Sequence, residues 1–313
     1  MSGTGRYEKL LERAHGMDPI PTAVAYPCDE SSLGGALDAA RLGLIVPILV
    51  GPAKKIAEIA KASHLNLGDT RIVDVEESRA AAAKAVELVR KGEAELIMKG
   101  SLHSDEILGA VVAKETGLRT GRRLSHVFLM DVPTYHKVLL VTDGAINIAP
   151  ALEDKADICQ NAIDLAKAFG VEKPKVAILA AVETVTTKMP ATIDAAALCK
   201  MADRGQIKGG LLDGPLAFDN AISKDAAKIK GIKSEVAGDP DILLAPDLEA
   251  GNMVAKQLSF LANADSAGLV LGARVPVILT SRADSVRARI ASCAVAALFA
   301  HARRSPATAG AIA

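Results

Sequence analysis

Short apolar runs alternate with longer amphipathic stretches along almost the whole chain, and this alternation limits the folds that it can adopt. Eleven apolar runs have the length and the β-branched content of buried strands. Strands that alternate with helices are typical of α/β proteins, in which helices cover a mainly parallel sheet. The expected strands lie at residues 22–26, 46–51, 71–75, 94–100, 124–131, 137–144, 175–181, 208–215, 241–247, 268–273 and 275–281.

Apolar residues at helical spacing fill most of the gaps between these strands. The expected helices cover residues 33–42, 53–63, 78–90, 105–115, 153–169, 192–202 and 252–262, and a long apolar helix leads to Arg304. Residues 124–144 depart from the alternation, because two expected strands are joined there only by Val-Pro-Thr-Tyr. A connection this short joins antiparallel strands, so we expect one hairpin within the parallel sheet.

Length and composition favour two domains with aliphatic cores. Half of the 313 residues are hydrophobic but only 3% are aromatic, so Ala, Val, Leu and Ile must fill the interior. This length is enough for two domains of ordinary size. Pro150 ends an extended segment before a new helix, and the last apolar helix needs a large surface to cover. We therefore expect one α/β/α domain from residues 1–150 plus 283–313, and a second from residues 151–282.

The charge balance and the cysteines bear on partners and location. Lys plus Arg and Asp plus Glu number 37 each, so the chain lacks the basic excess typical of nucleic-acid binding proteins. The start is charged from Arg6 onward, unlike a signal peptide, and no uncharged apolar run reaches the roughly 18 residues of a membrane span. Four scattered cysteines without a Cys-x-x-Cys pair indicate reduced thiols. We expect a cytoplasmic protein that binds neither nucleic acid nor membrane.

Five strand-to-helix junctions carry more polar residues than a plain turn requires. Ligands of open α/β sheets bind beyond the carboxyl ends of the strands, where helix N-termini also point. Asp, Ser and Asn at such places are also ordinary helix caps, and Gly permits tight turns. Caps alone explain any single junction, but five together indicate a site. The junctions are residues 98–106, 141–147, 211–220, 245–252 and 280–285.

The last junction, Thr-Ser-Arg-Ala-Asp-Ser, is the most informative. Arg282 places a permanent cation beside a helix N-terminus, and this combination suits a phosphate or a carboxylate. A salt bridge between Arg282 and an acid such as Asp284 is the alternative. His103 in the first junction either contacts a ligand or is a structural histidine. Cys28 follows a strand, but without a neighbouring base it is better explained as a buried thiol.

Searches for other functional motifs are negative. The sequence has no phosphate-binding loop of the G-x-x-x-x-G-K-[ST] type, no HExxH and no Cys/His cluster. The Gly-Thr-Gly near the start lacks the third glycine of a dinucleotide fingerprint and follows no strand. The sequence therefore predicts no bound metal.

Taken together, the five junctions resemble those of the phosphate acetyl/butyryltransferases. The resemblance covers nearly the whole chain and is carried by YPCDESSLGGALDAARLGLIVPILVGP, MKGSLHSDEILGAV, LSHVFLMD, GGLLDGPLAFDNAIS and PDILLAPDLEAGNMVAKQLSFLANADSAGLVLGARVPVILTSRADS. The chain is also similar to the acyltransferase half of fused enoyl-CoA hydratase–phosphate acetyltransferase proteins.

This resemblance implies two α/β/α domains with a cleft between them, in a fold similar to the isocitrate and isopropylmalate dehydrogenases. It also implies a homodimer. The implied reaction is acetyl-CoA plus phosphate giving acetyl phosphate plus CoA, by direct attack of the thiolate in a ternary complex. Coenzyme A is a substrate, and no metal or redox cofactor is expected in the chemical step.

The resemblance also implies roles for particular residues. Family members use a Ser-Arg pair in the last junction, which corresponds to Ser281 and Arg282, for the oxyanion and the phosphoryl oxygens. Ser101, His103 and Ser104 with Gly100 are expected to bind phosphate or acyl phosphate. The other expected substrate-binding residues are Asp143, Asp213, Gly214, Gly251 and Asn252, with Arg122 and Arg123 for the CoA phosphates.

The general base is the point where this sequence departs from the family pattern. Acetyltransferases of the family carry an Asp seven residues after the motif serine, and here that position is Ala288. Asp284, in the SRADS pattern associated with butyryltransferases, is the expected base, although it could equally cap the following helix. Asp143 and Asp213 are the reserve bases, and an attack without a strong base is also possible.

Three alternative functions remain open at this point. A phosphate butyryltransferase would use the same mechanism, because the acyl preference depends on a small apolar pocket. A dehydrogenase of the same fold would need convergent Asp residues and a Lys–Tyr pair, and none of the three tyrosines lies in the five junctions. A non-catalytic CoA-binding module is the third, motivated by Ala288.

Overall fold

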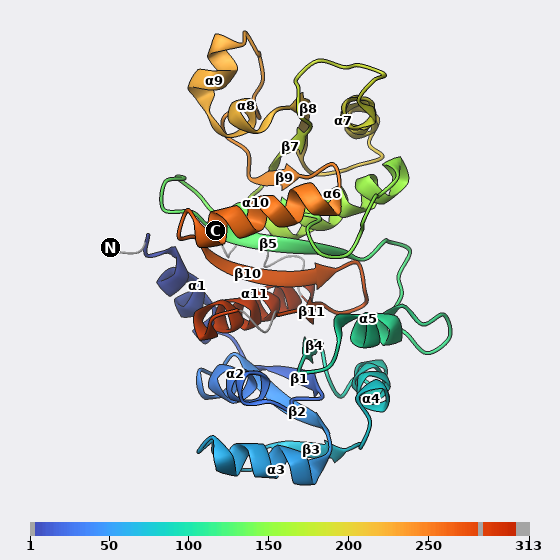
Figure 1. Ribbon diagram of the computed structural model, residues 1–313, viewed down its shortest axis with the longest axis vertical. Helices are drawn as coiled ribbons and strands as arrows, with labels where there is room; N and C mark the ends of the chain where they lie inside the picture. The colour runs from blue at the N-terminus through green and yellow to red at the C-terminus, as the bar shows by residue number, and fades with distance from the viewer. Residues whose placement is uncertain (1–3, 281–283, 305–313) are drawn as a thin grey trace. The chain divides into compact units, whose positions relative to one another are not determined.

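The structure, a computed structural model, describes residues 4–280 and 284–304 and has the expected α/β fold (Figure 1). All eleven expected strands form, as do the seven expected helices and the long last one. The chain divides into two compact units. The N-terminal unit comprises Gly5–Arg122 with Ala267–Ser305, and the central unit is built around Arg123–Ser266.

The N-terminal unit contains a mainly parallel sheet with the strand order β3-β2-β1-β4-β11-β10. Only the pair of β10 and β11 is antiparallel among its described pairs. The strands are β1 (Ile20–Ala25), β2 (Ile45–Gly51), β3 (Arg71–Asp74), β4 (Leu96–Lys99), β10 (Asp265–Leu271) and β11 (Val277–Ile278). The helices are α1 (Arg6–His15), α2 (Glu30–Arg41), α3 (Ala53–Ala62), α4 (Ser78–Arg90), α5 (Ser104–Val112) and α11 (Val286–Arg304).

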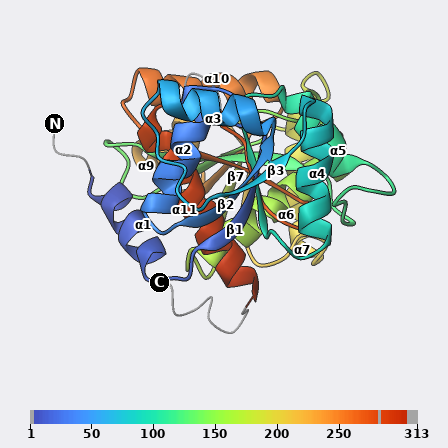
Figure 2. The same cartoon turned by 90° about the horizontal axis from the view of Figure 1, so that it is seen from below.

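These helices form two groups that flank the sheet of the N-terminal unit. Helices α4 and α5 pack together, while α11 packs against α1 and α2. Figure 2 shows β1, β2 and β3 between the two groups. Buried Val, Ile, Leu and Ala side chains fill both interfaces, as the aromatic-poor composition requires.

The central unit has the strand order β5-β6-β9-β7-β8. The expected hairpin is confirmed: β5 pairs antiparallel with β6, in the register Val127↔Thr142. The strands are β5 (Ser125–Asp131), β6 (Leu139–Thr142), β7 (Lys175–Leu179), β8 (Leu211–Leu216) and β9 (Ile242–Leu244). The helices are α6 (Leu152–Ala168), α7 (Pro190–Asp203), α8 (Phe218–Ile222), α9 (Lys224–Ile229) and α10 (Leu248–Phe260).

Helices cover both faces of the sheet in the central unit as well. Helices α8 and α10 contribute to one apolar core together with β5, β6, β7, β8 and β9. Helices α6 and α7 pack against each other and against strands of the same sheet. Because β6, β9, β7 and β8 are parallel, their carboxyl ends lie at one edge, where the amino end of β5 also lies.

The boundaries of the two compact units lie earlier in the chain than the domain boundaries expected from the sequence. Divisions were expected after residues 150 and 282, whereas the units divide after residues 122 and 266. The reason is the hairpin: β5 and β6 pair with each other, and β6 pairs with β9, so the segment from Arg123 belongs with the central strands. The last helix returns to the N-terminal unit, where α11 packs on α1.

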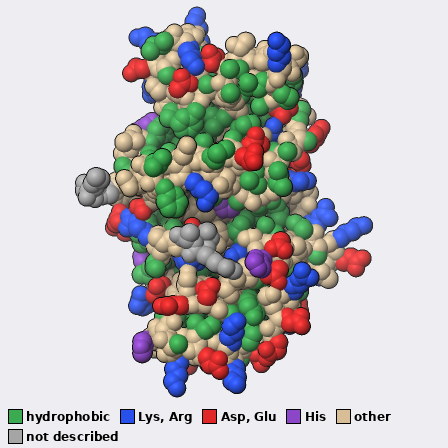
Figure 3. Space-filling view, viewed as in Figure 1, with side chains coloured by type: hydrophobic (Ala, Val, Ile, Leu, Met, Phe, Trp, Pro, Cys, Tyr) green, Lys and Arg blue, Asp and Glu red, His purple; other side chains and the backbone are tan. Residues whose placement is uncertain are grey.

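Two further features concern the surface. Among the described residues, no helix has the length and the apolar character needed to cross a membrane. Figure 3 shows acidic and basic side chains interspersed over the face in view, in keeping with the equal numbers of the two charges.

Candidate functional site

The N-terminal unit brings two of the five predicted junctions to the same sheet edge. Strand β11 pairs parallel with β4, in the register Ile278↔Met98, so the chain leaves both strands in the same direction. The segment after β4 carries Gly100, Ser101 and His103, and the segment after β11 carries Asp284. Ser281 and Arg282, the two residues expected to be central to catalysis, lie outside the described residues.

Ser101 fixes the loop after β4 to the loop after β1. Its hydroxyl donates to the Tyr26 carbonyl at 2.9 Å and accepts from the Cys28 N–H at 3.2 Å. Gly100 permits this contact, since a Cβ at that position would lie 2.4 Å from the carbonyl oxygens of Ala25 and Tyr26. The Gly-Ser pair therefore has a structural task at the edge of the sheet.

His103 and Ser104 stand at the start of α5 with exposed side chains. The Glu106 carboxylate accepts the backbone N–H of His103 at 2.8 Å and the hydroxyl of Ser78 at 2.6 Å. These bonds lower the pKa of Glu106, led by the bond from Ser78. The ionised carboxylate thus holds the α5 N-terminus, and the side chains of His103 and Ser104 face solvent.

Asp284 precedes α11 and is half-buried. The capping task at this helix falls to its neighbour: the Ser285 hydroxyl accepts the Ala288 N–H at 3.1 Å. Further along the helix, the buried Arg289 guanidinium donates to the Thr280 hydroxyl at 3.1 Å. The hydroxyls of Thr280 and Ser285 are therefore both bonded to residues of α11.

The central unit gathers a second group of predicted residues where β6 and β9 end. Asp143 is 3% exposed and follows β6 directly. One of its carboxylate oxygens accepts the N–H groups of Ala145 at 2.9 Å and Ile146 at 3.1 Å. The other accepts the backbone N–H of Asn147 at 3.2 Å and its side-chain amide at 2.5 Å. Four donors occupy this carboxylate, so the residue anchors the turn that follows β6.

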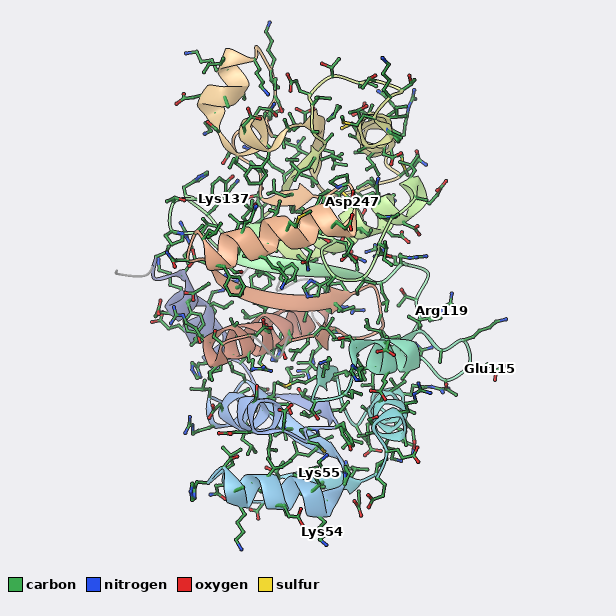
Figure 4. The ribbon with its side chains drawn as sticks, in the orientation of Figure 1. Lys54, Lys55, Glu115, Arg119, Lys137 and Asp247 are labelled. Carbon is green, nitrogen blue, oxygen red and sulfur yellow. The ribbon has the colours of Figure 1, made fainter. Side chains whose placement is uncertain are left out.

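Gly251 and Asn252 bring helix α10 against this turn. A Cβ on Gly251 would lie 2.2 Å from the Asp143 carbonyl oxygen, so only glycine fits the contact. The Asn252 amide donates to the Gly144 carbonyl at 2.9 Å. Asp247, labelled at the start of α10 in Figure 4, caps that helix by accepting the Ala250 N–H at 2.8 Å. The predicted residues of these two junctions are thus in direct contact.

Asp213 and Gly214 lie within strand β8, inside the range where a strand was expected. The junction expected at residues 211–220 begins as a strand, because β8 extends to Leu216. Asp213 pairs with Ala177 of β7 within the sheet, and its carboxylate accepts the Gly214 N–H at 2.9 Å. A Cβ on Gly214 would lie 2.8 Å from Ile178, so this glycine serves close strand packing. The Gly-Pro pair is accommodated in an edge strand, where proline is tolerated.

The two arginines proposed for the CoA phosphates belong to different units. Arg122 ends the first segment of the N-terminal unit, and its N–H donates to the Thr120 hydroxyl at 3.1 Å. Arg123 begins the central unit, where its guanidinium donates to the Asn147 side chain at 2.9 Å and pairs with Asp154 at 3.3 Å. Arg123 thereby ties the turn after β6 to helix α6.

His126 is a polar residue of this edge that the sequence analysis did not single out. It is 1% exposed, it lies on β5 beside the Asp143 turn, and its ring nitrogen Nδ1 has no hydrogen-bond partner among the described residues. Burial lowers the pKa of His126 to about 4, against an opposing effect of the Asp143 charge. The imidazole is therefore neutral near pH 7. The signal in the sequence that could have pointed to His126 is its position as a polar residue inside the apolar run LSHVFLMD.

Because His126 is buried in its neutral form, we expect the protein to lose stability in acid. Above pH 6.5 the imidazole is neutral in both folded and unfolded chains and contributes nothing to the pH dependence. Between pH 6.5 and 4 only the unfolded chain binds the proton, so the free energy of unfolding decreases as the pH is lowered. The total decrease across this range is on the order of 3 kcal/mol. Urea unfolding at pH 7.5, 6, 5 and 4.5 should show a shallower loss for His126→Gln. Equal slopes in the wild type, in His126→Gln and in the exposed-site control His15→Gln would contradict the prediction.

The cysteines are packed as thiols rather than poised as nucleophiles. All four are free, and Cys28, Cys159 and Cys293 are buried. Burial raises the pKa of the Cys28 thiol, and the nearby Lys55 ammonium only partly offsets this. The pKa of Cys293 is raised to about 12 by burial. Protonated thiols of this kind act as small apolar groups.

Comparison with known proteins identifies the family. The profile of the family described as phosphate acetyl/butaryl transferase matches residues 77–297, more than half of the chain. The chain belongs to this family. The resemblance expected from the sequence, and with it the assignment as an acyltransferase, is confirmed.

Named relatives of this family extend over nearly the whole chain. The phosphate acetyltransferase of Rhizobium meliloti is 64% identical over 300 residues, covering 96% of this chain and 95% of its own length. The phosphate butyryltransferase of Clostridium beijerinckii is 44% identical over 294 residues, covering 94% and 97%. The crystal structure of a branched-chain phosphotransacylase from Enterococcus faecalis V583 superposes with a TM-score of 0.79 at 29% identity, covering 90% of this chain and 99% of that one.

Proposed function

We propose that the protein is a phosphate acetyltransferase, which converts acetyl-CoA and phosphate into acetyl phosphate and CoA. The observation that carries this proposal is the 64% identity to a phosphate acetyltransferase over 96% of the chain, against 44% to a phosphate butyryltransferase. We assign a preference for the acetyl group because the acetyltransferase is the more similar of these two relatives.

The proposed chemistry is a direct transfer between the two substrates. In the direction of acetyl-CoA synthesis, the thiolate of CoA attacks the acetyl carbonyl, the C–S bond forms and the C–O bond to phosphate breaks. Arg282 would bind the phosphoryl oxygens, and Ser281 or a backbone N–H would donate to the oxyanion. Asp284 would accept the thiol proton. The chemical step needs no metal or redox cofactor.

The remaining assignments concern the loops and the assembly. Ser101, His103 and Ser104 would contact phosphate from the loop after β4, and Arg122 and Arg123 the CoA phosphates. Asp143, Gly251 and Asn252 would support the site through the contacts between the β6 turn and α10, and Asp213 and Gly214 would act at β8. The chain would work as a cytoplasmic homodimer.

An exposed apolar face supports the proposed homodimer. Met253, Phe260 and Leu261 recur at helical spacing in and just after α10, and Phe260 and Leu261 are 73% and 81% exposed. Large apolar side chains gathered on one exposed helix face are typical of subunit interfaces.

A direct assay tests the proposed function. Purified protein is mixed with CoA and either acetyl phosphate or butyryl phosphate, without added metal, and the thioester absorbance is followed. We expect turnover with both and a higher kcat/KM with acetyl phosphate. A higher kcat/KM with butyryl phosphate would make the protein a butyryltransferase. Absence of turnover by folded protein that still binds CoA would indicate a non-catalytic module.

A further inference from the structure

A pocket of about 510 Å³ lies in the central unit, beside helix α9. Its wall is formed by α9, by the segment that follows this helix and by the first residue of β7. A pocket of this volume can hold a small molecule. Its charged lining residues are Lys175, Lys224, Lys228, Lys233, Glu235 and Asp239.

This lysine-lined pocket lies at the opposite edge of the central sheet from the Asp143 turn. Lys175 begins β7, and Asp239 shortly precedes β9, whereas Asp143 follows the carboxyl end of β6. Because β6, β9 and β7 are parallel, the amino ends of β7 and β9 lie at the edge away from that turn. The pocket is therefore distinct from the contact between the β6 turn and α10.

The Asp239 carboxylate of the pocket is neutralised by neighbouring cations. It accepts a hydrogen bond from the Lys175 ammonium at 2.7 Å. The Lys137 ammonium, on a residue labelled in Figure 4, lies 3.2 Å from the same carboxylate, and His136 Nε2 lies 2.7 Å from it. Glu235 is the other carboxylate among the described lining residues.

The remaining three lysines of the pocket have no counter-charge of their own. Among the residues that the structure describes, the exposed side chains of Lys224, Lys228 and Lys233 form no ion pair or hydrogen bond. Lys230 of the same helix differs from them, because its ammonium pairs with Glu183 at 3.2 Å. The pocket thus carries three unpaired ammonium groups against the single carboxylate of Glu235, and a bound anion would relieve the repulsion between them.

The kind of donors in the pocket favours a phosphate group over a carboxylate. Ammonium groups bind phosphate as point charges, whereas the arginine fork best matches a planar carboxylate, and none of the described lining residues is an arginine. The Ser234 hydroxyl oxygen accepts the N–H groups of Val236 and Ala237 at 3.0 Å each, so its proton remains to donate to a ligand. Ala227 and Ile232 add apolar surface to the wall.

We propose that this pocket binds the phosphate group of a small molecule, at a site separate from the acyl transfer. The ammonium groups of Lys224, Lys228 and Lys233 would contact the phosphoryl oxygens, with the Ser234 hydroxyl as a further donor. The bound anion would link α9 and the segment after it to the start of β7. This inference goes beyond the proposed function and does not depend on it.

Calorimetric titration of the full-length protein tests the proposal with three probes. Glycerol 3-phosphate represents an organic phosphate, pyrophosphate an inorganic one, and succinate a dianion without phosphate. The triple variant Lys224→Gln/Lys228→Gln/Lys233→Gln removes the three exposed charges and keeps polar side chains. We expect the wild type to bind at least one of the phosphate probes more tightly than succinate, and the triple variant to bind that probe at least about tenfold more weakly.

The matched control is Lys9→Gln/Lys54→Gln/Lys61→Gln, which removes the same charge from exposed positions of α1 and α3. It should bind the probes like the wild type. Equal weakening in both triple variants would overturn the proposal, because net charge alone would then explain the binding. The stronger of the two phosphate probes identifies the source of the phosphate group.

The other outcomes separate this inference from the proposed function. A wild type that binds neither phosphate probe, or that binds succinate more tightly, would overturn the inference whatever its transferase activity. Equal binding by the wild type and the folded triple variant would overturn it as well. In the thioester assay the triple variant should retain the wild-type kcat/KM for acetyl phosphate, and a loss there would contradict a separate site. If the triple variant does not fold, the three single variants decide in the same titration.

Discussion

Replacing Gly251 with alanine is expected to destabilise the protein by about 3 kcal/mol or more, among the largest effects of any single methyl group in this chain. The added Cβ would lie 2.2 Å from the Asp143 carbonyl oxygen and 3.1 Å from the Ala245 side chain. Backbone atoms cannot turn away as a flexible side chain can. Helix α10 must therefore move off the turn after β6, which also strains the bond from Asn252 to Gly144.

Equilibrium urea unfolding of the Gly251→Ala variant measures this effect. Gly109→Ala is the matched control, because Gly109 is an exposed residue of α5 and a Cβ there meets no atom within 4 Å. Alanine in a helix interior is favoured over glycine, so the control should be as stable as the wild type or more stable by up to about 1 kcal/mol. A Gly251→Ala protein with wild-type stability would show that the contact between α10 and the β6 turn is looser than the structure has it.

Replacing Arg282 with alanine is expected to lower kcat/KM for acetyl phosphate by about 10²–10³-fold, if the protein acts as proposed. The variant loses the permanent cation that would bind the phosphoryl oxygens, while the fold should persist because Thr280 and Ser285 hold the flanking chain through Arg289 and Ala288. Arg282→Lys should recover part of the rate, since lysine keeps the charge but not the bidentate geometry.

The thioester assay compares these variants with Arg41→Ala. Arg41 is an exposed residue of α2 whose ion pair with Asp38 lies on the surface, so its loss should leave the kinetics unchanged. A folded Arg282→Ala protein with full activity would remove Arg282 from the mechanism. Loss of activity in Arg41→Ala to the same degree would mean that the assay reports general damage.

Much of the fold was predictable because its elements are long or strongly patterned. Buried parallel strands are continuous apolar runs, and the short Val-Pro-Thr-Tyr connection predicted the β5–β6 hairpin correctly. Helix α1 and the short helices α8 and α9 were missed, and for α8 and α9 the reason is that five or six residues carry too little periodicity. The strand expected at residues 208–215 was predicted with its Gly-Pro pair, although its bulged pairing with β7 is a tertiary effect that the sequence does not show.

For the candidate site, the sequence predicted which residues would gather rather than what each one does. Polar residues after strands were expected to lie together at a sheet edge, and the structure places Asp143, Gly251 and Asn252 in contact. A sequence cannot say whether a carboxylate caps its own turn, as Asp143 does, or faces a substrate. It also hides cations such as Lys99, because a lysine at the end of an apolar run resembles an ordinary strand end until its burial is known.

The return of the last helix has a consequence for synthesis on the ribosome. Most of the central unit is one continuous stretch of chain, Arg123–Ser266, so it can fold as soon as that stretch has emerged. The N-terminal unit is delayed, because β11 must pair with β4 and α11 must pack on α1 and α2. Until then β4 exposes an unpaired edge, which other chains can bind. The central unit therefore folds first although it is synthesised second, and the N-terminal unit completes its fold only after α11 has been synthesised.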